Sequence, residues 1–120
     1  MGFNNKGFNH KYKLACSHST PSDMLRYLAK DPDVTIRSSV AYNSTTPEDV
    51  IRKLATDIQW QVRYYVAMHP NINSNLLITI LEYEKSLKDP SDAVIQELYK
   101  NDKLPHIAKV IIETLYGEMI

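Results

Sequence analysis

Apolar residues recur along this chain at the three- and four-residue spacing of amphipathic helices, in short runs separated by polar and proline-containing segments. Side chains with this spacing share one face of a helix. The pattern therefore predicts an all-α chain of short helices, each with one buried face. Four such runs lie between residues 20 and 71: Leu25/Leu28/Ala29, Ile36/Val40/Ala41, Ile51/Leu54/Ala55 and Val62/Val66/Ala67.

The helical pattern repeats every 26 residues. Laying residues 20–45 over residues 46–71 without gaps gives ten identical pairs in 26, where unrelated segments would share about one or two. A repeat of this length is typical of stacked helical units. The identical pairs are Thr20/Thr46, Pro21/Pro47, Asp23/Asp49, Arg26/Arg52, Leu28/Leu54, Ala29/Ala55, Asp31/Asp57, Arg37/Arg63, Val40/Val66 and Ala41/Ala67.

The repeat continues in weaker form on both sides. Lys88-Asp89-Pro90 returns the letters of Lys30-Asp31-Pro32 at a spacing of 58, which exceeds two periods by six residues. Terminal repeats diverge because one of their faces meets water. The predicted organisation is a flexible segment 1–9 and one helical-repeat domain 10–120, made of partial repeats 10–19 and 72–87, full repeats 20–45 and 46–71, and a divergent cap 88–120.

Each repeat contains two helix starts, which divide it into a pair of short helices. Thr20-Pro21, like its copy 26 residues later, precedes the first apolar run. There we expect the threonine hydroxyl to cap a free backbone N–H, and proline fits the first helical turn. Asp31-Pro32 marks the start of the second helix. Further along, capping residues and prolines predict helices over 74–87, 91–100 and 105–116.

The letters that repeat resemble a known family. They read Thr-Pro, three residues, Leu or Ile, two residues, Leu-Ala, one residue, Asp, and later Ile or Val followed by Arg, two residues and Val-Ala. Over residues 10–81 this pattern is similar to the leucine-rich repeat variant family. The resemblance implies a HEAT-like α-solenoid, a short right-handed superhelix of stacked two-helix repeats. Some members carry an N-terminal cysteine cluster for an iron–sulfur centre, which Cys16 alone cannot provide.

Composition and charge remove several classes of function. Lys and Arg together number 14, as do Asp and Glu, so the basic excess typical of nucleic-acid binders is absent. Cys16 is the only cysteine, which leaves no internal disulfide and too few thiolates for a metal centre. No apolar run approaches the roughly 20 residues of a membrane span. We therefore expect a cytoplasmic protein without a membrane contact.

Catalytic and cofactor motifs are not visible either. The glycines lie only near the two ends, so no phosphate-binding loop is predicted. No pairing of an acid, a base or a nucleophile at meaningful spacing appears, and we expect a non-catalytic protein without cofactor or metal. The four histidines, expected to be solvent-facing or capping residues, lack metal-ligand spacing: His10, His18, His69 and His106.

An exposed aromatic stripe is the leading candidate for a binding site. With Val62 and Val66 pointing inward, Trp60, Tyr64 and Met68 fall on the opposite side of the same helix. Large rigid side chains at non-repeating, outward positions are typical of contacts with another protein. Packing of the stripe beneath an adjacent helix is the alternative. The full candidate set is Trp60, Tyr64, Met68, Tyr42 and Tyr65.

The repeated basic residues have a structural and a functional interpretation. Arg37 and Arg63 recur in register with Asp31 and Asp57, which favours a bidentate ion pair within or between repeats. The functional alternative is a nucleic-acid-binding face, although interleaved acids argue against it. A third hypothesis is a structural spacer within an assembly. The residues of the nucleic-acid alternative are Lys11, Arg26, Arg37, Arg52 and Arg63.

Overall fold

The computed structural model describes residues 6–120, which form eight α-helices and contain no strand. The all-α prediction is confirmed. Residues 1–5 of segment 1–9, for which flexibility is expected, lie outside the described part of the chain, and the first helix begins at Lys6. The helices are α1 (Lys6–Cys16), α2 (Ser22–Leu28), α3 (Val34–Tyr42), α4 (Glu48–Leu54), α5 (Trp60–Ala67), α6 (Ser74–Ser86), α7 (Asp92–Lys100) and α8 (His106–Tyr116).

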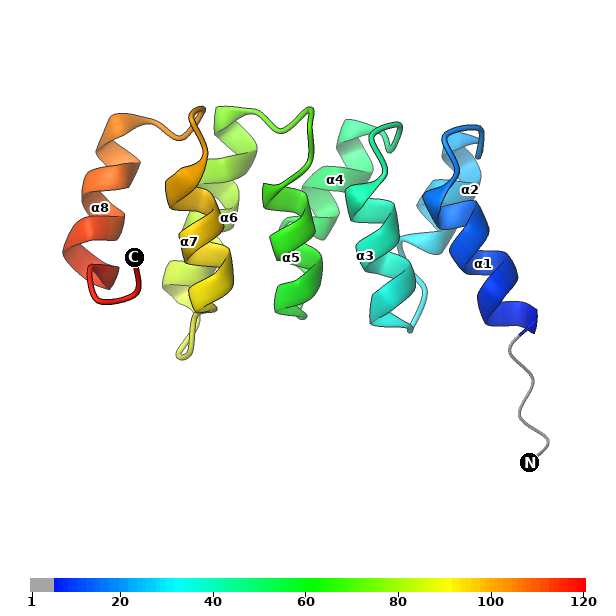
Figure 1. Ribbon diagram of the computed structural model, residues 1–120, viewed down its shortest axis with the longest axis horizontal. Helices are drawn as coiled ribbons and strands as arrows, with labels where there is room; N and C mark the ends of the chain where they lie inside the picture. Colours follow the sequence, from blue (N-terminus) through cyan, green and yellow to red (C-terminus); the bar gives the residue numbers. More distant parts are fainter. Residues whose placement is uncertain (1–5) are drawn as a thin grey trace.

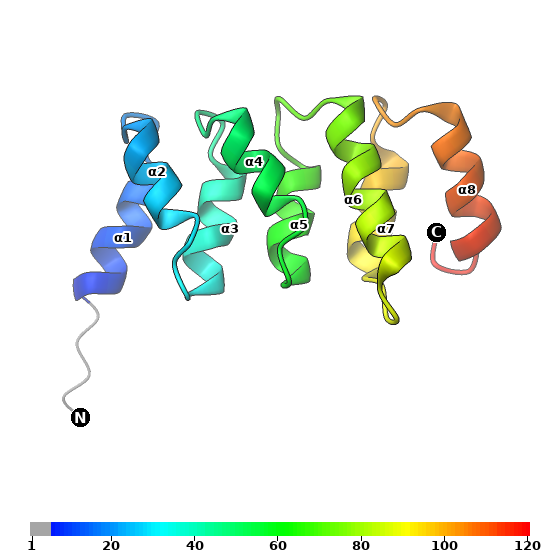
Figure 2. The ribbon, with the colours of Figure 1, turned by 180° about the vertical axis from the view of Figure 1, so that it is seen from behind.

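The helices form two layers in an elongated body of 50 × 32 × 19 Å. The odd-numbered helices α1, α3, α5 and α7 stand side by side in one layer (Figure 1), and the even-numbered helices α2, α4, α6 and α8 form the other (Figure 2). Odd-numbered helices pack directly on one another, and each even-numbered helix packs on the odd-numbered helices before and after it in the chain. The packing therefore follows the sequence from α1 at one end to α8 at the other.

The core runs between the two layers and is built from the apolar runs of the repeat. The leucine, isoleucine and valine residues of all four runs are buried, as predicted, and Ala29 is partly buried. Ala15, Ala41 and Ala67, spaced by 26 residues, are fully buried in or next to the odd-numbered helices. Small side chains at a contact let helix axes approach closely, which explains the direct packing within this layer.

The six extra residues of the third repeat lengthen one helix. Helices α2 and α4 have 7 residues each, and α6 has 13. The helices predicted over 74–87, 91–100 and 105–116 begin and end within one residue of α6, α7 and α8. The insertion therefore changes the length of an even-numbered helix and leaves the order of packing intact.

The Thr-Pro pairs join consecutive helices, and their predicted capping role is wrong. The hydroxyl of Thr20 donates to the carbonyl of Leu14 at 2.6 Å, and that of Thr46 donates to the carbonyl of Val40 at 2.7 Å. Neither α2 nor α4 has a side-chain cap, and each helix starts directly after its proline. Each threonine thus binds a free carbonyl of the preceding odd-numbered helix, which needs such a partner at its C-terminal end.

A ladder of ion pairs links the repeats along the odd-numbered layer. The ammonium of Lys11 lies 2.9 Å from a carboxylate oxygen of Asp31, and Nε of Arg37 lies 2.8 Å from Asp57. Arg63 pairs with Glu84 in the next step. Arg37 binds both oxygens of its partner, so the predicted bidentate pair forms between repeats. The link to Asp31 within the repeat runs instead from Arg37 Nη1 to the backbone carbonyl, at 2.9 Å.

Each carboxylate of the ladder also holds the start of the helix that follows it. The backbone N–H groups of Asp33, Gln59 and Ser91, which are the N-cap residues of α3, α5 and α7, each donate to the acid at 2.9 Å. For Asp31, burial alone would raise the pKa, but this N–H and the Lys11 ammonium together lower it below its ordinary range. The acids therefore act as charged partners that each serve two repeats.

The third acid comes from a position that the repeat does not predict. At the spacing of 58, Asp89 corresponds to Asp31, yet Asp89 is exposed and Glu84 on the lengthened α6 binds Arg63. Glu84 is fully buried. The same spacing places Ile95 at the position of Arg37, and Ile95 is buried. Within residues 6–120 the ladder thus has three steps and gives way to apolar packing at α7.

Replacing Arg63 by methionine tests the ladder. We expect Arg63→Met to lower the free energy of unfolding by about 3 kcal/mol or more, because it leaves the carboxylate of Glu84 buried without a cation. Arg52→Met is the matched control, since Arg52 pairs with Glu48 on the surface of α4, and it should cost less than about 1 kcal/mol. Urea unfolding followed by circular dichroism measures both, and equal losses would contradict the role of the ladder.

Candidate partner-binding surface

The predicted aromatic residues lie on the odd-numbered layer, over α3 and α5. Trp60 is 43% exposed, Tyr42 57% and Met68 37%, whereas Tyr64 and Tyr65 are partly buried. Val62 and Val66 on the same helix are fully buried, so α5 presents the stripe away from the core as predicted. The alternative of a stripe packed beneath a neighbouring helix does not hold for Trp60 and Met68.

Four of these aromatic rings touch in a continuous line from α3 to α5. Tyr42 meets Tyr65 edge-to-face with ring centres 5.5 Å apart, Tyr65 meets Tyr64 at 5.5 Å, and Tyr64 meets Trp60 at 6.1 Å. Edge-to-face contacts of this kind favour one relative orientation of the rings. The line therefore forms a ridge with limited side-chain freedom, which we call the aromatic ridge (Tyr42, Tyr65, Tyr64 and Trp60).

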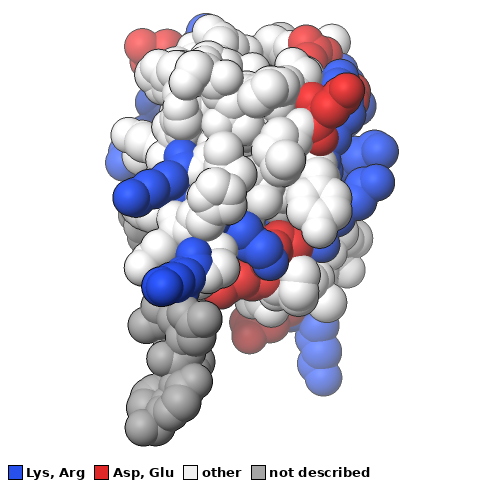
Figure 3. All heavy atoms as spheres, turned by 90° about the vertical axis from the view of Figure 1, so that its right-hand side faces the viewer, with Lys and Arg blue, Asp and Glu red and all other residues white. Residues whose placement is uncertain are grey.

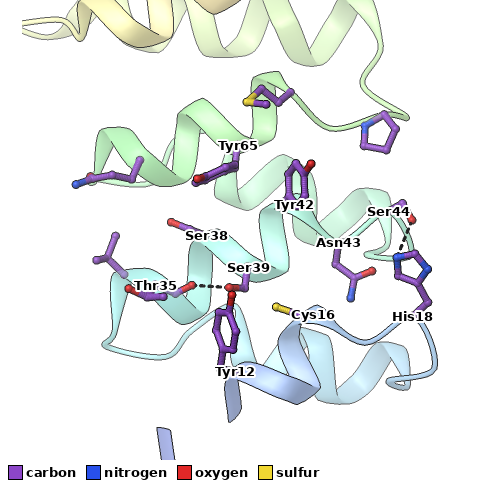
Figure 4. A pocket seen from close by; sticks show the side chains of 14 residues that line it. Tyr12, Cys16, His18, Thr35, Ser38, Ser39, Tyr42, Asn43, Ser44 and Tyr65 are labelled. Atoms are coloured by element: carbon purple, nitrogen blue, oxygen red, sulfur yellow. Dashed lines mark hydrogen bonds between the residues drawn. The ribbon is translucent and has the colours of Figure 1, made fainter. Parts of the chain in front are cut away.

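A groove of about 1020 Å³ lies beside the aromatic ridge, across α1, α3 and α5. In Figure 4, Tyr12 from α1, Tyr42 from α3 and Tyr65 from α5 border the same space, with Ser38 and Ser39 between them. None of the lining residues is Lys, Arg, Asp or Glu. They are Tyr12, Cys16, His18, Val34, Thr35, Ser38, Ser39, Tyr42, Asn43, Ser44, Gln61, Tyr65, Met68 and Pro70.

Reading the groove by the 26-residue period shows how the stack positions its side chains. Tyr12, Ser38 and Tyr64 occupy one register on α1, α3 and α5, and Cys16, Tyr42 and Met68 occupy another. The same non-repeating positions therefore line up across the layer. Tyr12 and Cys16 were not in the predicted set. Extending the register of the stripe back by two periods gives the signal that finds them.

A smaller hollow of about 330 Å³ lies on the other side of the ridge, between α5 and α7. Trp60, Tyr64, Gln96 and Lys100 are among its lining residues, and Gln61 and Tyr65 border both spaces. Lys100 pairs with Glu97 at 3.2 Å. Charged side chains thus enter the surface only beyond the ridge, toward α7.

Side-chain hydrogen bonds fix the loops at one end of the groove. The amide of Asn43 donates to the carbonyls of Ala15 and Ser17, both at 2.9 Å. His69, 26 residues later, lies 3.1 Å from the carbonyl of Asn43 through Nε2, while its Nδ1 accepts the N–H of Asn71. His69 is therefore neutral with its proton on Nε2, and it is buried, not solvent-facing. These bonds repeat the same link from one unit to the next.

The five basic residues of the nucleic-acid alternative do not share a surface. Lys11, Arg37 and Arg63 are engaged in the ladder, and Arg63 is only 3% exposed. Arg26 and Arg52 lie on α2 and α4 in the other layer, where they bind Asp49 and Glu48. Seen from the α1–α2 end, basic and acidic side chains stand next to one another (Figure 3). The structure therefore does not bring these residues together as one basic face.

Burial of His69 makes the stability of the fold depend on pH. Desolvation lowers the pKa of His69 below its ordinary value, which is about 6.5 in an unfolded chain. Below that value the unfolded chain binds the extra proton and the folded chain does not, so the contribution of neutral His69 is lost as the pH falls.

We expect the free energy of unfolding to decrease between pH 7.5 and 5.5, with a slope from this group of at most about 1.4 kcal/mol per pH unit. His69→Asn is the matched variant, because Asn43 fills the equivalent position in the preceding repeat. Urea unfolding at several pH values should give a flatter profile for the variant, and identical profiles would contradict the assignment.

The described residues hold no recognisable metal cluster or membrane helix. No group of three His, Cys, Asp or Glu side chains within residues 6–120 is placed to hold a metal ion. None of the eight described helices combines the length and apolar character needed to cross a bilayer. Comparison with known proteins gives no match among family models, curated proteins or solved structures. The resemblance to the leucine-rich repeat variant family thus stays a prediction, and the fold itself is eight helices packed in sequence order.

Proposed function

We propose that this chain is a non-catalytic protein-binding module, an adaptor or a small inhibitor, whose partner contacts the aromatic ridge. The observation that carries the proposal is the ridge itself, a line of touching aromatic rings on α3 and α5 with Trp60 and Tyr42 exposed at its ends. Tryptophan and tyrosine contribute most to binding when they stand on a well-ordered surface. A ridge next to a groove gives a partner both a raised and a recessed contact.

The division of labour between repeating and non-repeating residues supports the same function. Repeating residues such as Arg37 and Thr46 bind neighbouring units, whereas non-repeating positions line the open face of the odd-numbered layer. Stacked-repeat proteins use this arrangement to carry variable side chains on a constant frame. We accordingly place the chain among α-solenoids, as a short right-handed superhelix with HEAT-like repeats related to the leucine-rich repeat variant.

The ion pairs argue against nucleic acid as the partner. A phosphate backbone needs cations that are free to exchange counterions, and Arg37 and Arg63 already bind carboxylates inside the stack. Net charge is zero as well. The neutral, aromatic character of the ridge and groove suits a protein surface better.

Affinity capture from the native host, with mass-spectrometric identification, tests the proposed function. The double variant Trp60→Ala/Tyr64→Ala should recover at least about tenfold less of a specific partner, the effect expected when hot-spot aromatics are lost. Tyr27→Ala is the matched control, since Tyr27 is 67% exposed on α2 in the opposite layer. Circular dichroism confirms that all variants remain helical, and equal recovery with every variant would discard the ridge as the contact.

A gel shift tests the nucleic-acid alternative. We expect no shift of single-stranded or duplex DNA or RNA at low salt, where electrostatic binding is strongest. A shift that weakens steeply as salt rises, and that persists in Trp60→Ala/Tyr64→Ala, would contradict a protein partner.

A further inference from the structure

We propose that the groove across α1, α3 and α5 takes an extended, uncharged segment of the partner polypeptide, with one large apolar side chain among small polar residues. This inference rests on the proposed function and specifies the partner of the same surface. It is drawn from the charge of the groove, from the kind of polar groups that line it and from its position in the stack.

The absence of charge in the groove selects an uncharged segment. All fourteen lining residues are neutral or aromatic apart from His18, whose ring lies 3.5 Å from the hydroxyl of Ser44. A partner carboxylate or ammonium placed here would lose water and find no counter-charge, which is strongly unfavourable. Charges on the layer begin only at the Glu97–Lys100 pair beyond the ridge. A segment that crosses the groove therefore carries its charges, if any, outside it.

The polar groups of the groove suit an extended backbone better than a helix. Thr35, Ser38, Ser39 and Ser44 offer hydroxyl groups, and Asn43 and Gln61 offer amides. An extended segment has N–H and C=O groups that need partners, whereas a helix has already paired its own. Grooves that take an amphipathic helix are lined mainly by apolar side chains. The mixture found here favours main-chain hydrogen bonds to the partner.

Gln61 supplies one group ready for such a bond. Its carboxamide oxygen is buried and has no hydrogen-bond partner among the described residues. A buried acceptor without a donor is unfavourable by about 1–3 kcal/mol. Turning the carboxamide toward the groove breaks no described hydrogen bond and gives the oxygen to a partner N–H. Gln61 borders both the groove and the smaller hollow, so a segment in the groove passes beside it.

The tyrosines set the apolar part and the length of the segment. Tyr12, Tyr42 and Tyr65 come from three successive helices of the layer and border one space (Figure 4). With Val34 and Met68 they form an apolar patch for one large side chain. Axes of packed helices lie about 8–10 Å apart, so crossing from α1 to α5 takes about 20 Å, or roughly six residues at 3.3 Å each.

Selection from a displayed library of random heptapeptides tests the inference on the full chain. We expect the retained peptides to be depleted in Asp, Glu, Lys and Arg and to share one large apolar residue. Synthetic copies are then measured by fluorescence polarisation. Methylating backbone nitrogens one at a time should weaken binding at least about tenfold at one or more positions, because each removes a main-chain donor.

A charge placed in the groove is the matched variant. Thr35 is exposed in the first turn of α3, where an acid does not disturb a helix. Thr35→Glu should weaken binding of the selected peptides at least about tenfold, because it puts an unpaired carboxylate against an uncharged segment. Ser22→Glu, at the equivalent first turn of α2 in the other layer, should leave binding unchanged.

The outcomes separate this inference from the proposed function. Enrichment of charged peptides, retained binding by Thr35→Glu, or no retained peptide overturns the groove assignment. The same is true if maltohexaose, an uncharged saccharide, competes for the groove at the affinity of the peptides. In each case the proposed function still stands if Trp60→Ala/Tyr64→Ala loses the native partner. If that variant keeps the partner while Thr35→Glu loses the peptides, the groove is a binding site and the ridge is not.

Discussion

One carboxylate at each junction between repeats holds two parts of the fold together. Asp31, Asp57 and Glu84 each bind a cation from the preceding unit and the first N–H of the following odd-numbered helix. A charge this deep needs all of its partners, because an uncompensated ion in the interior is strongly unfavourable. The spacing between units and the start of each helix are therefore set by the same group. Register along the stack follows from this double use, and the open face of the odd-numbered layer inherits it.

The sequence predicted the frame well because packing and periodicity are linked. Helices over 74–87, 91–100 and 105–116, the buried apolar runs and the bidentate Arg37 pair all follow from positions that repeat. Repetition shows that a residue does the same thing in each unit, but it does not show what that is. Thr20 was expected to cap a helix and instead binds the carbonyl of Leu14. The direction of its hydroxyl depends on the conformation of the loop, which the letters alone do not define.

The insertion in the third repeat shows a second limit. Sequence spacing matches Asp89 with Asp31, but the extra residues lengthen α6 and leave Asp89 exposed. Glu84 on the added part of the helix meets Arg63 in its place. For the binding surface, helical spacing correctly placed Trp60 and Met68 outside the core. It could not predict the groove, since a hollow between helices depends on how three neighbours approach, and composition could not tell a buried arginine such as Arg63 from a free one.

The matched registers of Tyr12, Ser38 and Tyr64 and of Cys16, Tyr42 and Met68 have an evolutionary consequence. Each unit brings its own cation, its own acid and its own pair of open positions, so duplication of residues 46–71 within the stack would widen the open face by one helix without a new folding solution. Substitution at the open positions changes what is recognised and spares the junctions. Selection can thus act on specificity and on stability through separate sets of codons, which makes this architecture readily adaptable to a new ligand.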